Sequence, residues 1–258
     1  MLGVFKKYQG WFIMCECGIA VLIMALVYDG SGWPAALLLF VGLSAVAFVI
    51  MESCAGVMHR KILCILYVEQ KPGEFIAAYR PLTELKGVRR NIMFSMKAYL
   101  STAYAAQGDF DSALSVLEKM PLLGGKRQLS GDALISGNRC SFYLDAGDTQ
   151  KAEKEYALFR RGMEHASGRL RRELEATDEV LRLKLALARG NCDKAEEDDA
   201  RERLKKCGSP LLRTQMNLLI GQIYLQTGRL DFAREYLKSA AAASKTLWAA
   251  KKAASLLK

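Results

Sequence analysis

The residues of this chain that could do chemistry are few, and their spacing does not favour a reactive site. Thiol and imidazole groups gather near the N-terminus at Cys15, Cys17, Cys54, His59 and Cys64. Residues i and i+2 of a helix point about 160° apart, so the side chains of Cys15 and Cys17 would not converge on one ion. None of the spacings matches the paired ligands of structural zinc sites. We therefore predict that the cysteines pack as free thiols, and we expect no metal and no cofactor.

Two further stretches have the composition of ligand sites but the wrong context. Residues 124–127, Gly-Gly-Lys-Arg, lack the preceding buried strand and the following hydroxyl of a phosphate-binding loop. Residues 196–199 are all acidic, but on a helix they point around most of its circumference. We predict a solvated face there, paired with Arg201, Arg203 and Lys205. No nucleophile or metalloprotease motif occurs, and the chain is predicted not to be an enzyme.

Two apolar runs precede these stretches, and each is long enough to cross a bilayer. Residues 11–28 contain one charge, Glu16, and residues 34–51 contain none. Each run would be roughly 27 Å long as a helix, close to the hydrocarbon thickness. Since the link at residues 29–33 is short, we predict an antiparallel transmembrane hairpin that forms a first domain, residues 1–52.

The basic residues around the two runs predict their orientation. Lys6 and Lys7 precede the first run, Arg60 and Lys61 follow the second, and the link has no Lys or Arg. Basic residues favour the cytoplasmic side. Both termini and residues 53–258 are therefore expected in the cytoplasm. The compact two-span design suggests a bacterial plasma membrane.

Glu16 is the one ionisable residue inside a predicted span. A carboxylate in lipid is costly, which is typical of a proton or ion site. Glu16 is also only five residues past Trp11, near enough to reach the interface or a partner helix. A single carboxylate without a second acid or a cation does not make a transport path, so we favour the second interpretation.

A recurring pattern in the C-terminal part predicts pairs of helices. Each of four copies has a turn glycine, an alanine five residues later and, in three copies, a tyrosine four residues earlier. Glycine adopts the positive φ that ends a helix, and alanine lets the second helix approach the first. The glycines are Gly108, Gly147, Gly190 and Gly228, the tyrosines are Tyr104, Tyr143 and Tyr224, and the alanines are Ala113, Ala152, Ala195 and Ala233.

The copies are not equally regular. The third has Ala186 at the tyrosine position and Leu183 where the others have a small residue, a swap that partly conserves packed volume. A degenerate earlier copy is predicted over residues 62–85, with Gly73 as its turn glycine and Ala78 five residues later.

These positions resemble the tetratricopeptide repeat over roughly residues 59–245. The motif has a small residue, an aromatic, a glycine and an alanine at fixed places, filled in the first copy by Ser101, Tyr104, Gly108 and Ala113. The resemblance implies an all-α fold, a transmembrane helical hairpin followed by a tetratricopeptide-like α-solenoid over residues 53–258. Repeats of this kind stabilise one another by stacking. Residues 246–258 are expected to form a closing helix.

The resemblance also implies a function. Such repeats bind protein or peptide partners on their concave face, through residues of each first helix. The candidate partner-binding residues are Thr102, Asn138, Ser141, Lys184 and Gln222. We therefore expect a membrane-anchored scaffold or adaptor. The alternative is an accessory subunit of a membrane transport or enzyme complex that acts through its hairpin.

The charge adds a second expected partner. The chain has a net charge of +10, and residues 59–97 hold eight Lys or Arg against three Glu. Anionic lipids of the cytoplasmic leaflet attract such segments. Arg60, Lys61, Arg89 and Arg90 are the candidate lipid-surface residues. No nucleic-acid-binding motif occurs, and no nucleic-acid partner is expected.

Overall fold

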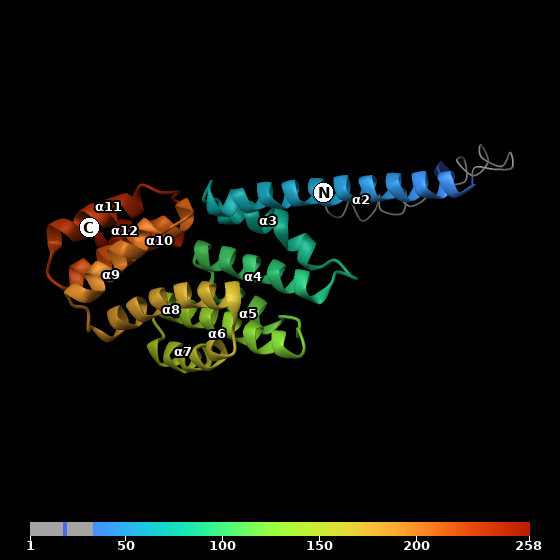
Figure 1. Ribbon diagram of the computed structural model, residues 1–258. Helices are drawn as coiled ribbons and strands as arrows, with labels where there is room; N and C mark the ends of the chain where they lie inside the picture. Colours follow the sequence, from blue (N-terminus) through green and yellow to red (C-terminus); the bar gives the residue numbers. More distant parts are fainter. Residues whose placement is uncertain (1–17, 20–32) are drawn as a thin grey trace. The chain divides into compact units, whose positions relative to one another are not determined.

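The computed structural model describes residues 18–19 and 33–258, and the regular structure of these residues is entirely α-helical (Figure 1). This confirms the predicted all-α class. The chain divides into two compact units, Met1–Ile62 and Leu63–Lys258. The division does not fall after residue 52, because helix α2 (Trp33–Tyr67) runs unbroken through that point.

Helix α2 contains the second predicted span, and its described side chains are mostly apolar and exposed. Val41, Val46, Val49 and Ile50 are each more than half exposed. The first predicted span lies outside the described residues except for positions 18 and 19, as do Cys15, Glu16 and Cys17. Within the part of the chain that the structure describes, no helix is long and apolar enough to cross a membrane.

The second unit consists of helical pairs joined by short turns. The first helices of successive pairs, α4, α6, α8 and α10, contact one another in order, and the second helices lie outside them (Figure 1). The helices are α3 (Pro72–Thr83), α4 (Arg90–Gln107), α5 (Phe110–Glu118), α6 (Lys126–Ala146), α7 (Thr149–Glu164), α8 (Gly168–Arg189), α9 (Lys194–Lys205), α10 (Pro210–Gln226), α11 (Leu230–Ala241) and α12 (Trp248–Leu256).

The four predicted turn glycines are where the first helices end. Gly108, Gly147, Gly190 and Gly228 have φ of 95°, 87°, 76° and 76°, a conformation that costs glycine little. An aspartate follows three of these turns and caps the next helix: the carboxylates of Asp109, Asp148 and Asp193 each accept a hydrogen bond from a backbone N–H. Local sequence therefore dictates the pairing of the helices.

In the degenerate first copy α3 follows the end of α2, but the turn between them differs from the prediction. Gly73 lies inside the first turn of α3 and makes no bend. The residue with positive φ in this turn is Gln70, at 59°. The expectation that Gly73 is the turn glycine is therefore wrong. A side chain in the left-handed region is strained, and its contacts, described below, compensate for that strain.

The third pair also departs from the predicted pattern. Helix α9 begins four residues after Gly190, whereas α7 begins two residues after Gly147. This two-residue extension leaves Ala195 exposed in the first turn of α9. Glu197 takes the helical position that Ala152 holds in α7, and it is 2% exposed. The prediction that Ala195 packs against the first helix is wrong for this copy.

The close approach of paired helices depends on one small residue in each contact. At Gly221 of α10, an added Cβ would lie 2.7 Å from Cγ of Leu237 in α11. The third pair reverses the sizes: Leu183 of α8 and Ala200 of α9 are buried in the same core cluster.

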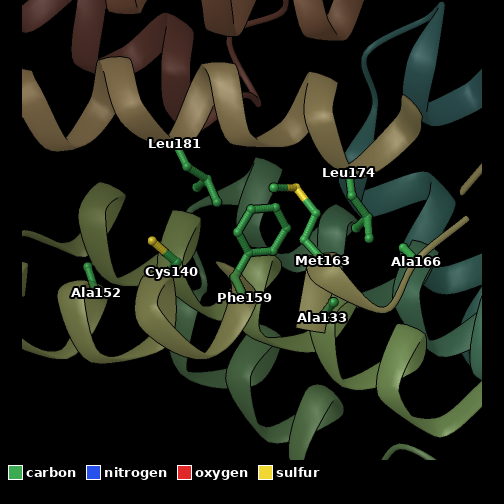
Figure 2. Close-up of a cluster of buried hydrophobic side chains, with 8 residues drawn as sticks. All are labelled: Ala133, Cys140, Ala152, Phe159, Met163, Ala166, Leu174 and Leu181. Atoms are coloured by element: carbon green, nitrogen blue, oxygen red, sulfur yellow. The ribbon is translucent and has the colours of Figure 1, made fainter. Parts of the chain in front are cut away.

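The core of the second unit is a series of clusters between consecutive helices. In Figure 2, Phe159 and Met163 of α7 lie between Cys140 of α6 and Leu174 of α8. Phe159 is fully buried and approaches α6 at Gly137, where an added Cβ would be 3.0 Å from its ring. Each second helix therefore packs on both neighbouring first helices, as the stacking of repeats requires.

The last helices of the second unit return to its first helices. The Gln70 side chain donates to Thr214 Oγ1 (2.9 Å) and accepts from the Ser244 N–H (3.4 Å). The Trp248 side chain lies over Gly108 and makes an edge-to-face contact with Phe110, with ring centroids 5.4 Å apart. The predicted closing helix is therefore α12, and its contacts complete a turn of helices rather than only covering the last pair.

Candidate functional site

We call the first helices of the pairs, α4, α6, α8 and α10, the inner helices. Two of the five candidate partner-binding residues contact each other on them. Lys184 of α8 donates from Nζ to Ser141 Oγ of α6 (2.9 Å) and to both carboxylate oxygens of Asp145 (2.7 Å each). The Lys184 and Asp145 side chains are 16% and 20% exposed. The contact joins two first helices near their C-terminal ends and presents a fixed pair of charges.

The other three candidates lie on the same layer of helices without joining this contact. Thr102 of α4 donates from Oγ1 to the Ala98 carbonyl one turn earlier (3.0 Å). Asn138 of α6 and Gln222 of α10 are half-buried. The structure therefore places all five residues on first helices, and it groups only Ser141 and Lys184.

A second polar contact on the inner helices was not predicted. Gln226 at the end of α10 donates from Nε2 to the Leu187 carbonyl at the end of α8 (3.2 Å). With the Lys184 contact, it links α6, α8 and α10 in sequence. Asp145, also missed, stands four residues after Ser141, and this helical spacing is the sequence signal that could have indicated it.

The outer side of the second and third pairs holds a buried carboxylate. Asp178 of α8 is 7% exposed and accepts from the Tyr156 hydroxyl and the Arg160 guanidinium, at 2.9 Å each. Burial, and then the hydrogen bond to Asp178, raise the pKa of Tyr156 to about 12. The cluster fixes α7 against α8, because a buried carboxylate needs such partners.

The acidic run at residues 196–199 is only in part the solvated face that was predicted, because Asp198 and Asp199 are exposed but Glu197 is not. Glu197 is buried, and its Oε1 accepts from Thr227 Oγ1 at 2.7 Å. Its Oε2 lies 3.0 Å from the Arg229 guanidinium but is not aligned with an N–H, so this contact is an ion pair without a hydrogen bond. These contacts join α9 to the turn between α10 and α11.

The expected partners of the run differ as well. Arg201 pairs with Asp198 as predicted, but Arg203 pairs with Glu179 and Lys205 with Glu202. A cavity of about 320 Å³ lies between α8 and α9. It is lined by Glu179, Arg182, Leu183, Glu196, Asp199, Glu202, Arg203 and Lys206.

The described cysteines are free thiols that differ in exposure: Cys140 is buried, but Cys54 and Cys64 on α2 are exposed, so the prediction that the cysteines pack is wrong for these two. Burial raises the pKa of Cys140 to about 12 and that of Cys192 to about 11, so both thiols stay protonated at neutral pH. Among residues 18–19 and 33–258, no group of His, Cys, Asp and Glu side chains is arranged to hold a metal ion. The polar contacts described above are suited to binding by hydrogen bonds and charge.

The candidate lipid-surface residues are exposed in both units. Arg60 and Lys61 lie on α2 in the first unit, and Arg89 and Arg90 lie at the start of α4 in the second.

Searches against protein-family models, curated proteins and solved structures found no match to this chain.

Proposed function

We propose that this protein is a membrane-anchored scaffold or adaptor whose helical pairs bind a protein or peptide partner on the inner helices. The observation that supports this most is the contact among Lys184, Asp145 and Ser141. It holds a lysine and an aspartate in one geometry on neighbouring first helices. A side chain that is already ordered loses little entropy when a ligand binds, so a preorganised pair of charges is suited to recognition.

The remaining candidates extend this surface along the same layer. Thr102, Asn138 and Gln222 are half-buried and polar on α4, α6 and α10. Polar side chains at corresponding places on successive first helices can follow an extended peptide, with one contact for each pair. The resemblance of the repeat positions to tetratricopeptide repeats supports the same mode of binding.

Two observations support the proposed membrane anchor: the composition of residues 34–51 and the unbroken helix α2 that contains them. Residues 34–51 contain no charged residue, and the described side chains of α2 in this range include exposed valines and isoleucine. With residues 11–28, they would form a hairpin that places both termini and the repeats in the cytoplasm, at a bacterial plasma membrane, beside anionic lipids.

Crosslinking in native membranes, followed by identification of the crosslinked proteins, tests the proposed binding surface. Gln222→Arg and Thr102→Arg each add a long cation to the inner helices, and we expect both to abolish the crosslinks of the wild-type chain. Leu158→Arg is the matched control, since Leu158 is 50% exposed on the outer helix α7. Crosslinks that survive both inner variants would contradict the proposal.

A swap of the hairpin separates the proposal from the alternative. Residues 1–52 are replaced by an unrelated two-span anchor, and the crosslinking is repeated. A scaffold that binds through its helical pairs keeps its partners. Loss of all partners, with the inner variants still crosslinked in the native context, would instead support an accessory subunit that acts through the hairpin.

A further inference from the structure

One loop of the second unit holds a leucine outward in a defined conformation. The Gln128 side chain accepts from the backbone N–H of Leu123 (2.8 Å) and of Gly124 (3.3 Å), which fixes the loop between α5 and α6. Leu123 packs inward, because its Cδ1 is 3.0 Å from where a Cβ on Gly131 would be. Leu122, its neighbour, is 70% exposed. Its exposure is thus built into the loop.

The start of α4 lies beside this loop and adds to the exposed apolar surface. Phe94 contacts the same position on Gly131 as Leu123 does. The Lys97 ammonium donates to the Lys119 carbonyl, which joins α4 to the end of α5. Near these contacts, Ile92 and Leu129 are 47% and 45% exposed. Leu122 lies in the connection α5–α6, and Ile92 and Leu129 lie in the first turns of α4 and α6. The connections α3–α4 and α5–α6 are at the same end of the helices (Figure 1).

The same end carries an excess of positive charge. We call residues 84–92 and 119–129 the basic edge. Its described basic side chains, Lys86, Arg89, Arg90 and Lys119, are all exposed. Its one acidic residue, Glu84, pairs with Arg80. The opposite ends of the helices, at the glycine turns, instead carry the capping aspartates of α5, α7 and α9.

We propose that the basic edge docks on an anionic lipid bilayer, with its basic side chains at the lipid phosphates and Leu122 inserted between the headgroups. Basic residues flanking a protruding apolar side chain fit such a surface better than a protein interface, because lipid phosphates accept charge at any position while the apolar contact needs only a shallow insertion. This inference rests on the proposed location at a membrane. It adds a second lipid contact, made by the repeats themselves.

Amide hydrogen exchange of the full chain tests the docking. The protein is reconstituted in nanodiscs of phosphatidylcholine alone or mixed with phosphatidylserine. We expect the amides of residues 119–125 to exchange about tenfold more slowly in the anionic discs, since docking removes them from water. The turn at residues 190–193, on the opposite end of the helices, should exchange equally in both. Equal exchange of residues 119–125 in the two lipids would overturn the proposal.

Variants assign the protection to the basic edge. Leu122→Asp should remove the protection, and Leu230→Asp is its matched control, since Leu230 is 62% exposed on α11, away from this loop. Arg89→Glu with Arg90→Glu should weaken the docking by at least about 25-fold, at roughly fivefold per basic residue. Protection that survives Leu122→Asp, or that disappears equally in Leu230→Asp, would show that the loop is not the contact.

Failure of the anchor can be distinguished from failure of the docking. A chain that does not enter nanodiscs shows that the hairpin prediction is wrong. Sedimentation with preformed vesicles then decides the docking alone: the wild-type chain should pellet with phosphatidylserine vesicles and remain in solution with phosphatidylcholine vesicles. A chain that enters nanodiscs but shows no dependence on lipid charge keeps its anchor and lacks the docking contact. If the chain neither enters nanodiscs nor pellets with phosphatidylserine vesicles, the docking proposal is wrong as well.

Discussion

The carboxylate of Glu197 shows how a small change of chain length alters the role of one residue. Two extra residues before α9 move Glu197 to the buried position that alanine holds in α7. There it pairs with Arg229 and Thr227 of the next pair. A buried charge is tolerated only with such partners. The residue therefore joins two pairs of helices where the usual alanine would join only one.

Removal of this carboxylate should weaken the second unit. We expect Glu197→Ala to lower the free energy of unfolding by about 1–3 kcal/mol, because Thr227 and Arg229 lose a buried partner. Chemical denaturation of the full chain measures the change. Arg201→Ala, which breaks an exposed pair with Asp198 on the same helix, should leave the unfolding free energy nearly unchanged. Similar losses in both variants would contradict a special role for Glu197.

The raised pKa of Tyr156 predicts that the folded protein loses stability at alkaline pH. Its pKa is raised from 10.0 to about 12, first by burial and then by its hydrogen bond to Asp178. The folded chain therefore holds this proton more tightly than the unfolded chain. The stabilisation is complete below pH 10 and is lost as the pH rises towards about 12. Tyr156→Phe should show a shallower fall of stability over this range, measured by denaturation at several pH values. Identical slopes for the two proteins would refute the assignment.

Within the last helical pair, Gly221 allows α10 and α11 to approach closely. An added methyl group would meet Leu237 at 2.7 Å, so Gly221→Ala should destabilise the protein by about 1–3 kcal/mol. Combining it with Leu237→Val should cost less than the sum of the two single changes, since the valine makes room. Thermal or chemical denaturation measures all three.

Gly73→Ala is the matched control for this change. Gly73 is helical in α3 and has nothing within 4 Å of an added Cβ. Alanine should therefore stabilise the protein by roughly 0.5–1 kcal/mol, by restricting the unfolded chain. Because alanine has the higher helix propensity, destabilisation at Gly73 as large as at Gly221 would mean that an added methyl group is harmful without any close contact, and that Leu237 does not explain the effect.

The helical pairs could be predicted because their signals are local. A turn glycine, a capping aspartate and an alanine at fixed spacing specify each pair within about twenty residues. The prediction was wrong where the spacing changed, at Ala195, and where a non-glycine residue, Gln70, made the turn. It also missed Asp145 and Gln226, whose partners lie about forty residues away. Contacts at that distance depend on the curvature of the stack, which no single pair encodes.

The closure of the second unit is a property of the whole set of helices. Trp248 covers Gly108 and Phe110, and Gln70 bonds to Thr214 and to the Ser244 backbone. These contacts hold the first and last pairs together, so the inner helices have a fixed spacing. They also limit how wide a partner the inner helices can accept.

Trp248→Ala should open this closure. We expect it to lower the unfolding free energy by about 2 kcal/mol, less than for a fully buried tryptophan, and to raise the hydrogen exchange of residues 108–110. The distribution of distances between spin labels at the exposed positions 71 and 245 should broaden. Trp248→Phe keeps an aromatic ring over Gly108 and should behave like the wild type. An unchanged label distance in Trp248→Ala would show that the closure does not depend on this side chain.

The contact between Gln70 and Ser244 also has a consequence for synthesis on the ribosome. The two residues are 174 positions apart, which at usual translation rates is a delay of roughly 10–35 s. During that time the first pair can fold locally, but its turn has no partner, and the left-handed Gln70 has nothing to compensate its strain. The nascent chain therefore carries an unfinished surface until Thr214 and Ser244 emerge. A message truncated before α10 would yield a product whose Gln70 turn has neither partner, which quality-control proteases can recognise near the start of the second unit.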